Sequence, residues 1–125
     1  MFEVSVEETF AAGHALRGYR GKCENVHGHN YRVQLTLEGP ELDAIGLLVD
    51  FVEVKRLIHG VVDRLDHRFI NDLPPFDLVN PSAENLAKYF YDEATQTLDR
   101  ATGGRVRVKN VTIFETDSTT ATYLG

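Results

Sequence analysis

Two segments of the chain alternate between apolar and polar residues. In residues 2–14 the apolar side chains fall at even positions, and His14 ends the segment in phase with them. Residues 27–39 repeat the alternation at odd positions, beginning with His27 and His29. A period of two is typical of a β-strand with one buried face. We therefore predict two strands whose histidines lie on the same face as their apolar residues.

The period changes after residue 50. Between residues 51 and 65 the apolar residues recur at spacings of three and four: Val54, Leu57, Ile58, Val61, Val62 and Leu65. This spacing predicts an amphipathic helix. Asp50 is placed to cap the first turn, and Glu53 can complete a capping box with it.

A second helix is predicted after Pro74-Pro75, which enforces a loop. It begins near residue 80, where Asn80 or Ser82 can act as the N-cap. Its apolar residues form one row, namely Leu86, Phe90 and Ala94, with Ala87, Tyr91 and Leu98 beside it. Gly103-Gly104 ends the helix.

The chain returns to strand-like alternation in residues 105–115. A slip in parity predicts a β-bulge near Lys109-Asn110. Residues 116–120 read as a polar turn, and residues 121–124 as a short last strand. The order ββααββ, in one domain spanning residues 1–125, indicates an α+β fold with an antiparallel sheet and helices on one face.

Composition and charge narrow the classes of partner and the cellular setting. The net charge is −6 with no basic cluster, which argues against nucleic acids and anionic membranes as partners. The single cysteine cannot form an internal disulfide, so a reducing, cytoplasmic setting is expected. No apolar run reaches about 18 residues and the first residues do not resemble a signal peptide.

The three strand histidines form the strongest chemical signal. His27 and His29 share a strand face, and His14 lies in phase on the neighbouring strand, so all three can converge. Three histidines with an open fourth position are typical of catalytic zinc. A structural zinc site with Cys23 as the fourth ligand stays open, as does the reading of each histidine as a lone imidazole.

Cys23 lies in a polar loop four residues before His27. A free cysteine is often a small buried hydrophobe, but a neighbouring Lys22 and a nearby metal would favour the thiolate. Asp66-His67 could supply the imidazole partner that such a thiol needs. The alternative is that His67 caps the end of the first helix, and no local rule decides between them.

Two further ionisable residues need an interpretation. Glu115 ends an apolar strand, where it is either an exposed carboxylate or a buried acceptor for the paired N–H groups of an aminopyrimidinone ring. His59, inside the first helix, has no partner at ligand spacing and is interpreted as structural or exposed.

Taken together, the motifs resemble the 6-pyruvoyltetrahydropterin synthase family over essentially the whole chain. The gap of three residues between Cys23 and His27 resembles the bacterial branch of the family, 6-carboxytetrahydropterin synthase of the queuosine pathway. The segments that carry the resemblance are Phe10–His14, Cys23–Tyr31, Leu65–Asp72, Asn80–Asn85 and Glu115-Thr116.

The resemblance implies the tunnelling fold, a four-stranded antiparallel sheet with two helices on one face. It also implies a homo-oligomer, a hexamer in this family, with active sites between subunits. The roles that it implies are zinc ligation by His14, His27 and His29, proton transfer by Cys23 and by Asp66 with His67, and pterin binding by Glu115 with Ser82.

The activity implied is conversion of 7,8-dihydroneopterin triphosphate to 6-carboxy-5,6,7,8-tetrahydropterin, with release of acetaldehyde and triphosphate. The competing predictions are 6-pyruvoyltetrahydropterin synthase and a non-catalytic pterin- or metal-binding module. Because the chain is acidic, we expect Arg17, Arg20 or Lys22 to offset the charge of the triphosphate.

Overall fold

Four antiparallel strands form one sheet in the order β1-β2-β3-β4. The computed structural model describes residues 1–125. Its elements are β1 (Phe2–His14), the short 3-10 helix η1 (Lys22–Glu24), β2 (His27–Gly39), α1 (Phe51–Leu65), the short 3-10 helix η2 (Ile70–Asp72), α2 (Ala83–Thr102), β3 (Arg107–Thr116) and β4 (Thr119–Tyr123). The predicted α+β architecture with ββααββ order is confirmed.

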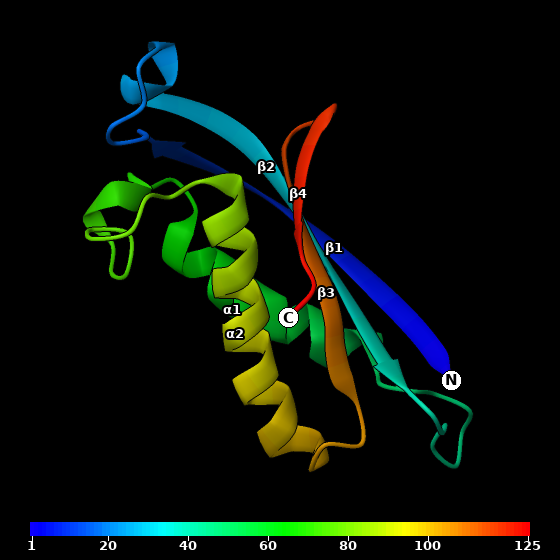
Figure 1. Cartoon of the computed structure of the whole chain (residues 1–125). Coiled ribbons are helices and arrows are strands. Elements are labelled where there is room, and N and C mark those ends of the chain that lie inside the picture. Colours follow the sequence, from blue (N-terminus) through cyan, green and yellow to red (C-terminus); the bar gives the residue numbers. More distant parts are fainter.

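Both α-helices pack on the same face of the sheet (Figure 1). The apolar positions of β1 and β2 face these helices, and they form a single core of 25 buried residues with α1, α2, β3 and parts of the connecting segments. Phe10 and Tyr31 lie near the centre of this face, with ring centroids 4.9 Å apart in a stacked arrangement. Burial of one sheet face against two amphipathic helices is what the alternating and helical periods predict.

The first turn of α1 is capped as the sequence predicts, with one difference. The Asp50 carboxylate accepts the backbone N–H of Val52 at 2.9 Å. The carboxylate of Glu53 does not reach back to complete a capping box, because it pairs with Arg56 at 2.7 Å one turn further along the helix. The helix boundaries, residues 51 and 65, agree with the periodic pattern.

Ser82 rather than Asn80 provides the side-chain cap of α2. Its hydroxyl accepts the backbone N–H of Asn85 at 3.1 Å. At the other end Gly103 adopts φ 61°, the left-handed conformation that lets a glycine end a helix. The side chain of Asn80 has another partner, in the loop that follows β1.

The predicted bulge in β3 is present. Thr36 of β2 lies opposite Asn110, but the next residue, Leu37, lies opposite Val108. Lys109 is therefore the extra residue that has no partner in the ladder. This extra residue explains the slip of hydrophobic parity along β3.

The last hairpin is tighter than the sequence predicts. The predicted starts of β3 and β4 were both wrong by two residues. The predicted turn of residues 116–120 shrinks to Asp117-Ser118, because Thr116 and Thr119 pair across the strands. Their hydroxyl oxygens lie 2.6 Å apart, which draws residues 119 and 120 into the ladder. β4 consequently begins two residues before the predicted strand, and β3 begins at residue 107 instead of 105.

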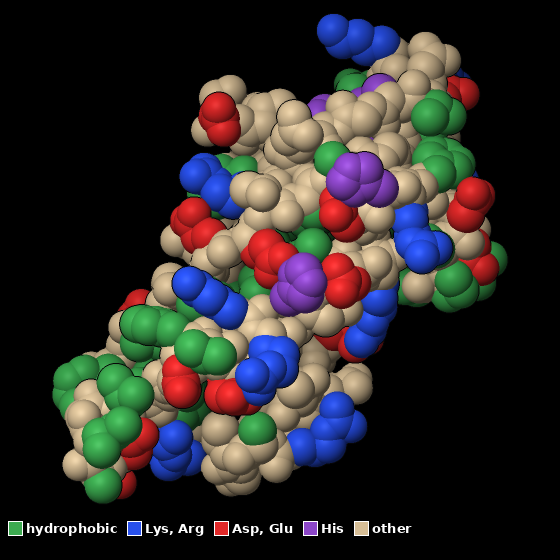
Figure 2. Space-filling model, turned by 180° about the vertical axis from the view of Figure 1, so that it is seen from behind, with side chains coloured by type: hydrophobic (Ala, Val, Ile, Leu, Met, Phe, Trp, Pro, Cys, Tyr) green, Lys and Arg blue, Asp and Glu red, His purple; other side chains and the backbone are tan.

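The surface of the molecule carries charges of both signs. Acidic and basic side chains are interspersed over the face shown in Figure 2, without a large patch of one sign. Neither α-helix is long and apolar enough to cross a lipid bilayer.

Candidate active site

The register between β1 and β2 brings the three strand histidines together. His14 lies directly opposite His27, and His29 follows two residues later on the same face. One ring nitrogen from each histidine lies within 4.8 Å of the other two. We call these three side chains the histidine cluster.

Hydrogen bonds at the far side of two rings fix which nitrogens face the centre of the cluster. The Nδ1 atom of His14 lies 2.7 Å from the carbonyl oxygen of Pro81, and Nδ1 of His27 lies 2.7 Å from that of Asn25. Because a carbonyl only accepts, each Nδ1 carries the proton and a neutral ring has its lone pair on Nε2. The two Nε2 atoms face each other at 2.9 Å.

Two bare lone pairs at that distance repel each other unless a cation lies between them. His29 adds a third nitrogen, because its Nε2 atom is buried and has no hydrogen-bond partner. A carbonyl bonded to the outer nitrogen is also the usual way in which a metal-binding imidazole is oriented. The cluster therefore fits a metal ion.

Burial favours the neutral, ligating form of the rings. His14 is 1% exposed. Desolvation is the main cause that lowers the pKa of His14 and of His29, while the nearby Glu115 carboxylate opposes it. Because metal ligation requires the neutral imidazole, the environment prepares these rings for a cation.

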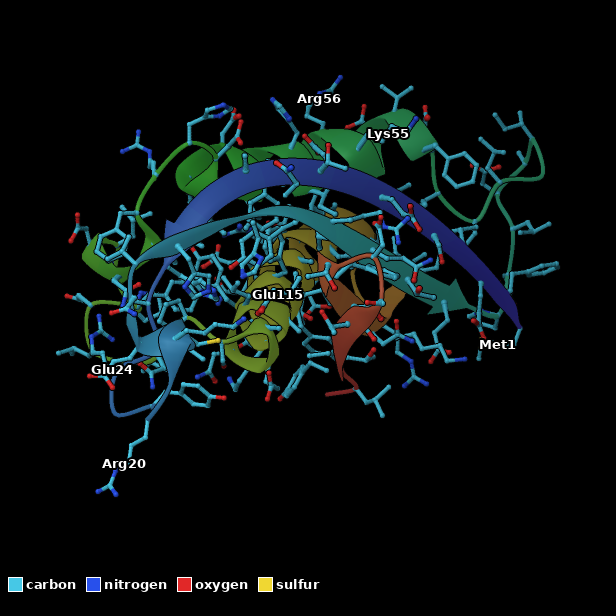
Figure 3. The ribbon with its side chains drawn as sticks, turned by 90° about the horizontal axis from the view of Figure 1, so that it is seen from above. Met1, Arg20, Glu24, Lys55, Arg56 and Glu115 are labelled. Carbon is cyan, nitrogen blue, oxygen red and sulfur yellow. The ribbon has the colours of Figure 1, made fainter.

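Glu115 approaches the cluster from β3. One of its carboxylate oxygens lies 3.3 Å from Nε2 of His29, and the side chain is 27% exposed. Figure 3 shows Glu115 inside the arch formed by β1 and β2. The residue is therefore a half-buried acceptor beside the cluster and not a solvated strand end.

Cys23 lies in η1, half-buried and without a disulfide partner. Its backbone carbonyl accepts the N–H of Leu16 at 2.9 Å, which ties η1 to the end of β1. The group of close ligand atoms contains the three histidines and neither Cys23 nor a carboxylate. This geometry favours three histidine ligands with an open position over a closed site that includes Cys23.

Asp66 and His67 lie apart from the cluster, at the end of α1. The Asp66 carboxylate accepts the N–H of Ala11 at 2.9 Å and lies 3.0 Å from Nδ1 of His67. The Ala11 N–H is the main cause that lowers the pKa of Asp66. Because the imidazole pairs with Asp66 and with no helix carbonyl, the capping interpretation of His67 does not hold.

His67 has two unusual features. Its side chain is 81% exposed, and its φ of 59° places a non-glycine residue in the left-handed region. Such strain is often found at functional positions, where the surrounding structure holds it in place. Here the backbone N–H of His67 donates to the carbonyl of Ala11 at 2.6 Å, which locks the residue against the edge of β1.

The three cations expected to offset a triphosphate have different positions. The Arg17 guanidinium donates to the backbone carbonyls of Asn71 and Phe76, at 3.3 and 2.7 Å. Arg20 extends away from the body of the molecule in Figure 3. Neither side chain points its charge at the histidine cluster, and Lys22 has no ion-pair partner in the structure.

The remaining histidine, His59, has the peripheral position that its sequence context predicts. Its side chain is 60% exposed and lies between Glu8 at 2.5 Å and Asp63 at 3.3 Å. The Glu8 carboxylate, through a hydrogen bond, is the main cause that raises the pKa of His59. Glu8 is the one polar residue that interrupts the apolar positions of β1. Its ion pair with His59 of α1 explains why a carboxylate stands at this position.

Two asparagines near the site make contacts that the sequence did not predict, since Asn71 was given no role and Asn80 was considered only as a helix cap. The side-chain amide of Asn71 pairs with both the N–H and the C=O of Ala15, and that of Asn80 pairs in the same way with Arg17. Both belong to segments that carry the family resemblance. Nothing in the local sequence shows which backbone they contact, because their partners lie more than fifty residues away.

Comparison with known proteins agrees with the fold. The sequence model described as 6-pyruvoyl tetrahydropterin synthase matches residues 3–125. A relative from Bacillus subtilis (strain 168), named 6-carboxy-5,6,7,8-tetrahydropterin synthase, is 38% identical over 103 residues, which cover 78% of this chain and 68% of the relative. A relative of the same name from Aquifex aeolicus (strain VF5) is 30% identical and covers 98% of this chain and 97% of its own length.

The same relationship is seen in three dimensions. The solved structure of Caenorhabditis elegans 6-pyruvoyl tetrahydropterin synthase superposes with a TM-score of 0.84 and 30% sequence identity, covering 100% of this chain and 97% of that one. The tunnelling fold predicted from the sequence is thereby confirmed. The chain belongs to the 6-pyruvoyl tetrahydropterin synthase family.

Proposed function

We propose that the protein is a zinc-dependent 6-carboxy-5,6,7,8-tetrahydropterin synthase in queuosine or 7-deazapurine biosynthesis. Its substrate would be 7,8-dihydroneopterin triphosphate, which with one water gives 6-carboxytetrahydropterin, acetaldehyde and triphosphate. The observation that carries the proposal is the histidine cluster with three inward-facing nitrogens and with Cys23 in the adjoining turn. The names of the Bacillus and Aquifex relatives support the carboxy-forming reaction.

Each residue has a distinct part in this proposal. His14, His27 and His29 would hold zinc, which when bound polarises the hydroxyl oxygens of the substrate side chain and acidifies the neighbouring C–H bonds. Cys23 would accept a proton from such a carbon as the thiolate. Glu115, half-buried beside His29, would accept the paired N–H groups of the pterin ring.

His67 would be the second proton-transfer group. Asp66 holds Nδ1 of the imidazole, so that Nε2 is left to exchange protons with the substrate. Ser82 caps α2 directly after Pro81, whose carbonyl orients His14, and would line the pterin pocket.

The position of His67 favours an active site that is shared between copies of the chain. His14 of the cluster is buried against the start of α2, whereas the exposed His67 lies at the outer edge of β1 and its imidazole pairs only with Asp66. We infer a homo-oligomer, a hexamer in line with the family resemblance, in which His67 of one subunit serves the histidine cluster of its neighbour. The outer edge of β4 and the part of the outer edge of β1 that precedes Ala11 are available for joining one sheet to the next.

The alternative reaction, formation of 6-pyruvoyltetrahydropterin, is favoured by the structural match to the C. elegans enzyme. One incubation with 7,8-dihydroneopterin triphosphate separates the candidates. Acetaldehyde with 6-carboxytetrahydropterin supports the proposal, and 6-pyruvoyltetrahydropterin would replace it with the alternative. If the pterin is bound unchanged, the protein is a binding module. A parallel reaction with a chelator, restored by Zn²⁺, tests the metal requirement.

A further inference from the structure

The outer edge of β1 is paired over part of its length by a segment that is not a strand. Alternate residues of a strand direct their backbone N–H and C=O groups to the same side. At the outer edge Ala11 bonds to Asp66 and to the N–H of His67, and the N–H of Gly13 donates to the carbonyl of Arg68 at 3.0 Å. The chain after α1 therefore takes the place of a neighbouring strand.

Beyond His14 the same edge is continued by side chains. The amide of Asn71 accepts the N–H of Ala15 and donates to its C=O, both at 2.9 Å. The amide of Asn80 repeats this pair with Arg17, again with both distances at 2.9 Å. Two side-chain amides thus reproduce the hydrogen bonds that a partner strand would make, although β1 itself has ended.

Leu16, between Ala15 and Arg17, directs its backbone N–H to the opposite side, where it binds the backbone of Cys23. This N–H donates to the carbonyl of Cys23 at 2.9 Å. The segment 15–17 is therefore fixed on one side by two asparagines and fixes η1 on its other side. Asn71 is only 8% exposed, so water does not compete strongly for its hydrogen bonds.

We propose that Asn71 and Asn80 are positioning residues that hold Cys23 at its working distance from the histidine cluster, through the backbone of residues 15–17. Asn80 has a second effect, because it directly precedes Pro81, whose carbonyl orients the His14 ring. Asn71 holds Ala15, which directly follows His14 in the chain, but it does not precede the carbonyl that orients the His14 ring. The two asparagines consequently act on the thiol together, and Asn80 also acts on the orientation of the His14 ring through Pro81.

The experiment uses the full-length protein and two readouts that do not depend on turnover. Because Cys23 is the only cysteine, its rate of alkylation by iodoacetamide reports this one thiol. In Asn71→Ala, at a temperature where the protein is fully folded, we expect alkylation to be faster by about threefold or more, since the half-buried thiol is released. Zinc affinity stays within about twofold, because the ligand orientation is unchanged.

Turnover gives the matching kinetic signature. In Asn71→Ala kcat falls by about tenfold or more while KM changes little, because a misplaced thiol affects the reaction and not the pterin contacts. Asn71→Asp keeps the acceptor for Ala15 and loses the donor, so its effects are intermediate. Asn80→Ala repeats the change in alkylation and also weakens zinc binding by about tenfold, the usual effect of losing support for a ligand.

The matched control is Thr102→Val at the opposite end of α2. The Thr102 hydroxyl makes a comparable clamp, with the carbonyls of Leu98 and Val106 at 2.9 and 3.3 Å, and is remote from Cys23. The Thr102→Val variant should be less stable than the wild type, and the alkylation rate of its Cys23 should equal that of the wild type. The proposal would be overturned if both asparagine variants were alkylated at the wild-type rate. It would also be overturned if the alkylation rate of Thr102→Val changed as much as theirs.

This inference rests on the proposed function only for the chemical role of Cys23. If the alkylation rates change as expected but no pterin product forms, the proposed function fails and the positioning by the asparagines stands. If the wild type forms the pterin product and alkylation is unchanged in the variants, the proposed function stands and the positioning by the asparagines fails.

Discussion

The histidine cluster and the Asp66–His67 pair differ in how much of their surroundings one chain supplies. His14 is 1% exposed, and its ring is fixed by a backbone carbonyl from the start of α2. His67 is equally well fixed in its backbone, but its side chain is 81% exposed and its imidazole pairs only with Asp66. The three ligand candidates of the cluster come from one chain, whereas the proposed role of the pair is in the site of a neighbouring subunit.

The largest effect is expected from the cluster itself. In His29→Ala the metal content should fall from about one equivalent per chain to below about a tenth, and activity should be lost with it. His59→Ala is the control, because its ring is exposed and pairs only with carboxylates. Metal analysis of the purified proteins checks both. A full equivalent of zinc in His29→Ala would remove His29 from the ligand set.

Cys23→Ala separates binding from catalysis. We expect kcat to fall by about 10²- to 10⁴-fold, the usual contribution of a proton-transfer group, while zinc and pterin binding are kept. Binding is measured by calorimetry and turnover by product formation. Unchanged turnover would exclude Cys23 from proton transfer, and loss of zinc would instead return it to the ligand set.

Mixed oligomers test whether the pair serves a neighbouring subunit. Cys23→Ala and His67→Ala are each inactive alone in the proposed arrangement. Refolded together in equal amounts, they should regain about a quarter of wild-type activity, because one site in four combines an intact Cys23 with an intact His67 from the next chain. Mixtures that stay inactive, although hetero-oligomers form, would place both residues in the same chain's site.

A smaller effect is expected at Ser82, where a cap and a pocket residue coincide. Ser82→Ala should lower the free energy of unfolding by about 1 kcal/mol, since the N–H of Asn85 loses its acceptor. KM for the pterin should rise as well. Asp50→Ala removes the corresponding cap of α1, with a similar loss of stability and no change in KM. Equal KM values in the two variants would leave Ser82 as a cap alone.

The smallest effect concerns the anchoring of the pair to β1. The pKa of Asp66 is lowered in the folded protein, so its charge stabilises the fold above the ordinary pKa of about 3.9. This contribution is lost as the pH falls through the lowered value. Urea midpoints of wild type and Asp66→Asn should therefore differ slightly at pH 7 and converge in acid. A difference that persists unchanged in strong acid would contradict this account.

The main elements could be predicted because their periods follow from local burial. Both ends of β1, β2 and α1 agree with the sequence pattern, since each has a regular apolar stripe. The convergence of three histidines also followed from strand parity. The start of β4 did not, because its first threonines are polar, and the bond between Thr116 and Thr119 that recruits them is visible only across the hairpin.

The surroundings of the site were less accessible to sequence reasoning. Cys23, Asp66 and His67 could be singled out as residue types, but their separation depends on where the end of α1 meets β1. Asn71 gave no local signal and Asn80 only that of a helix cap, because an asparagine in a loop usually bonds to nearby backbone. Arg17 was expected near a phosphate, and its use as a donor to two carbonyls depends on the same long-range contacts.

The central claim is that the histidine cluster binds zinc and, together with Cys23, cleaves the side chain of a pterin triphosphate to a carboxylate. The most direct test is the product formed from 7,8-dihydroneopterin triphosphate by the zinc-loaded protein. We predict 6-carboxytetrahydropterin and acetaldehyde in equal amounts, none with a chelator, and recovery when Zn²⁺ is returned. A 6-pyruvoyl product, or full activity in the metal-free protein, would contradict it.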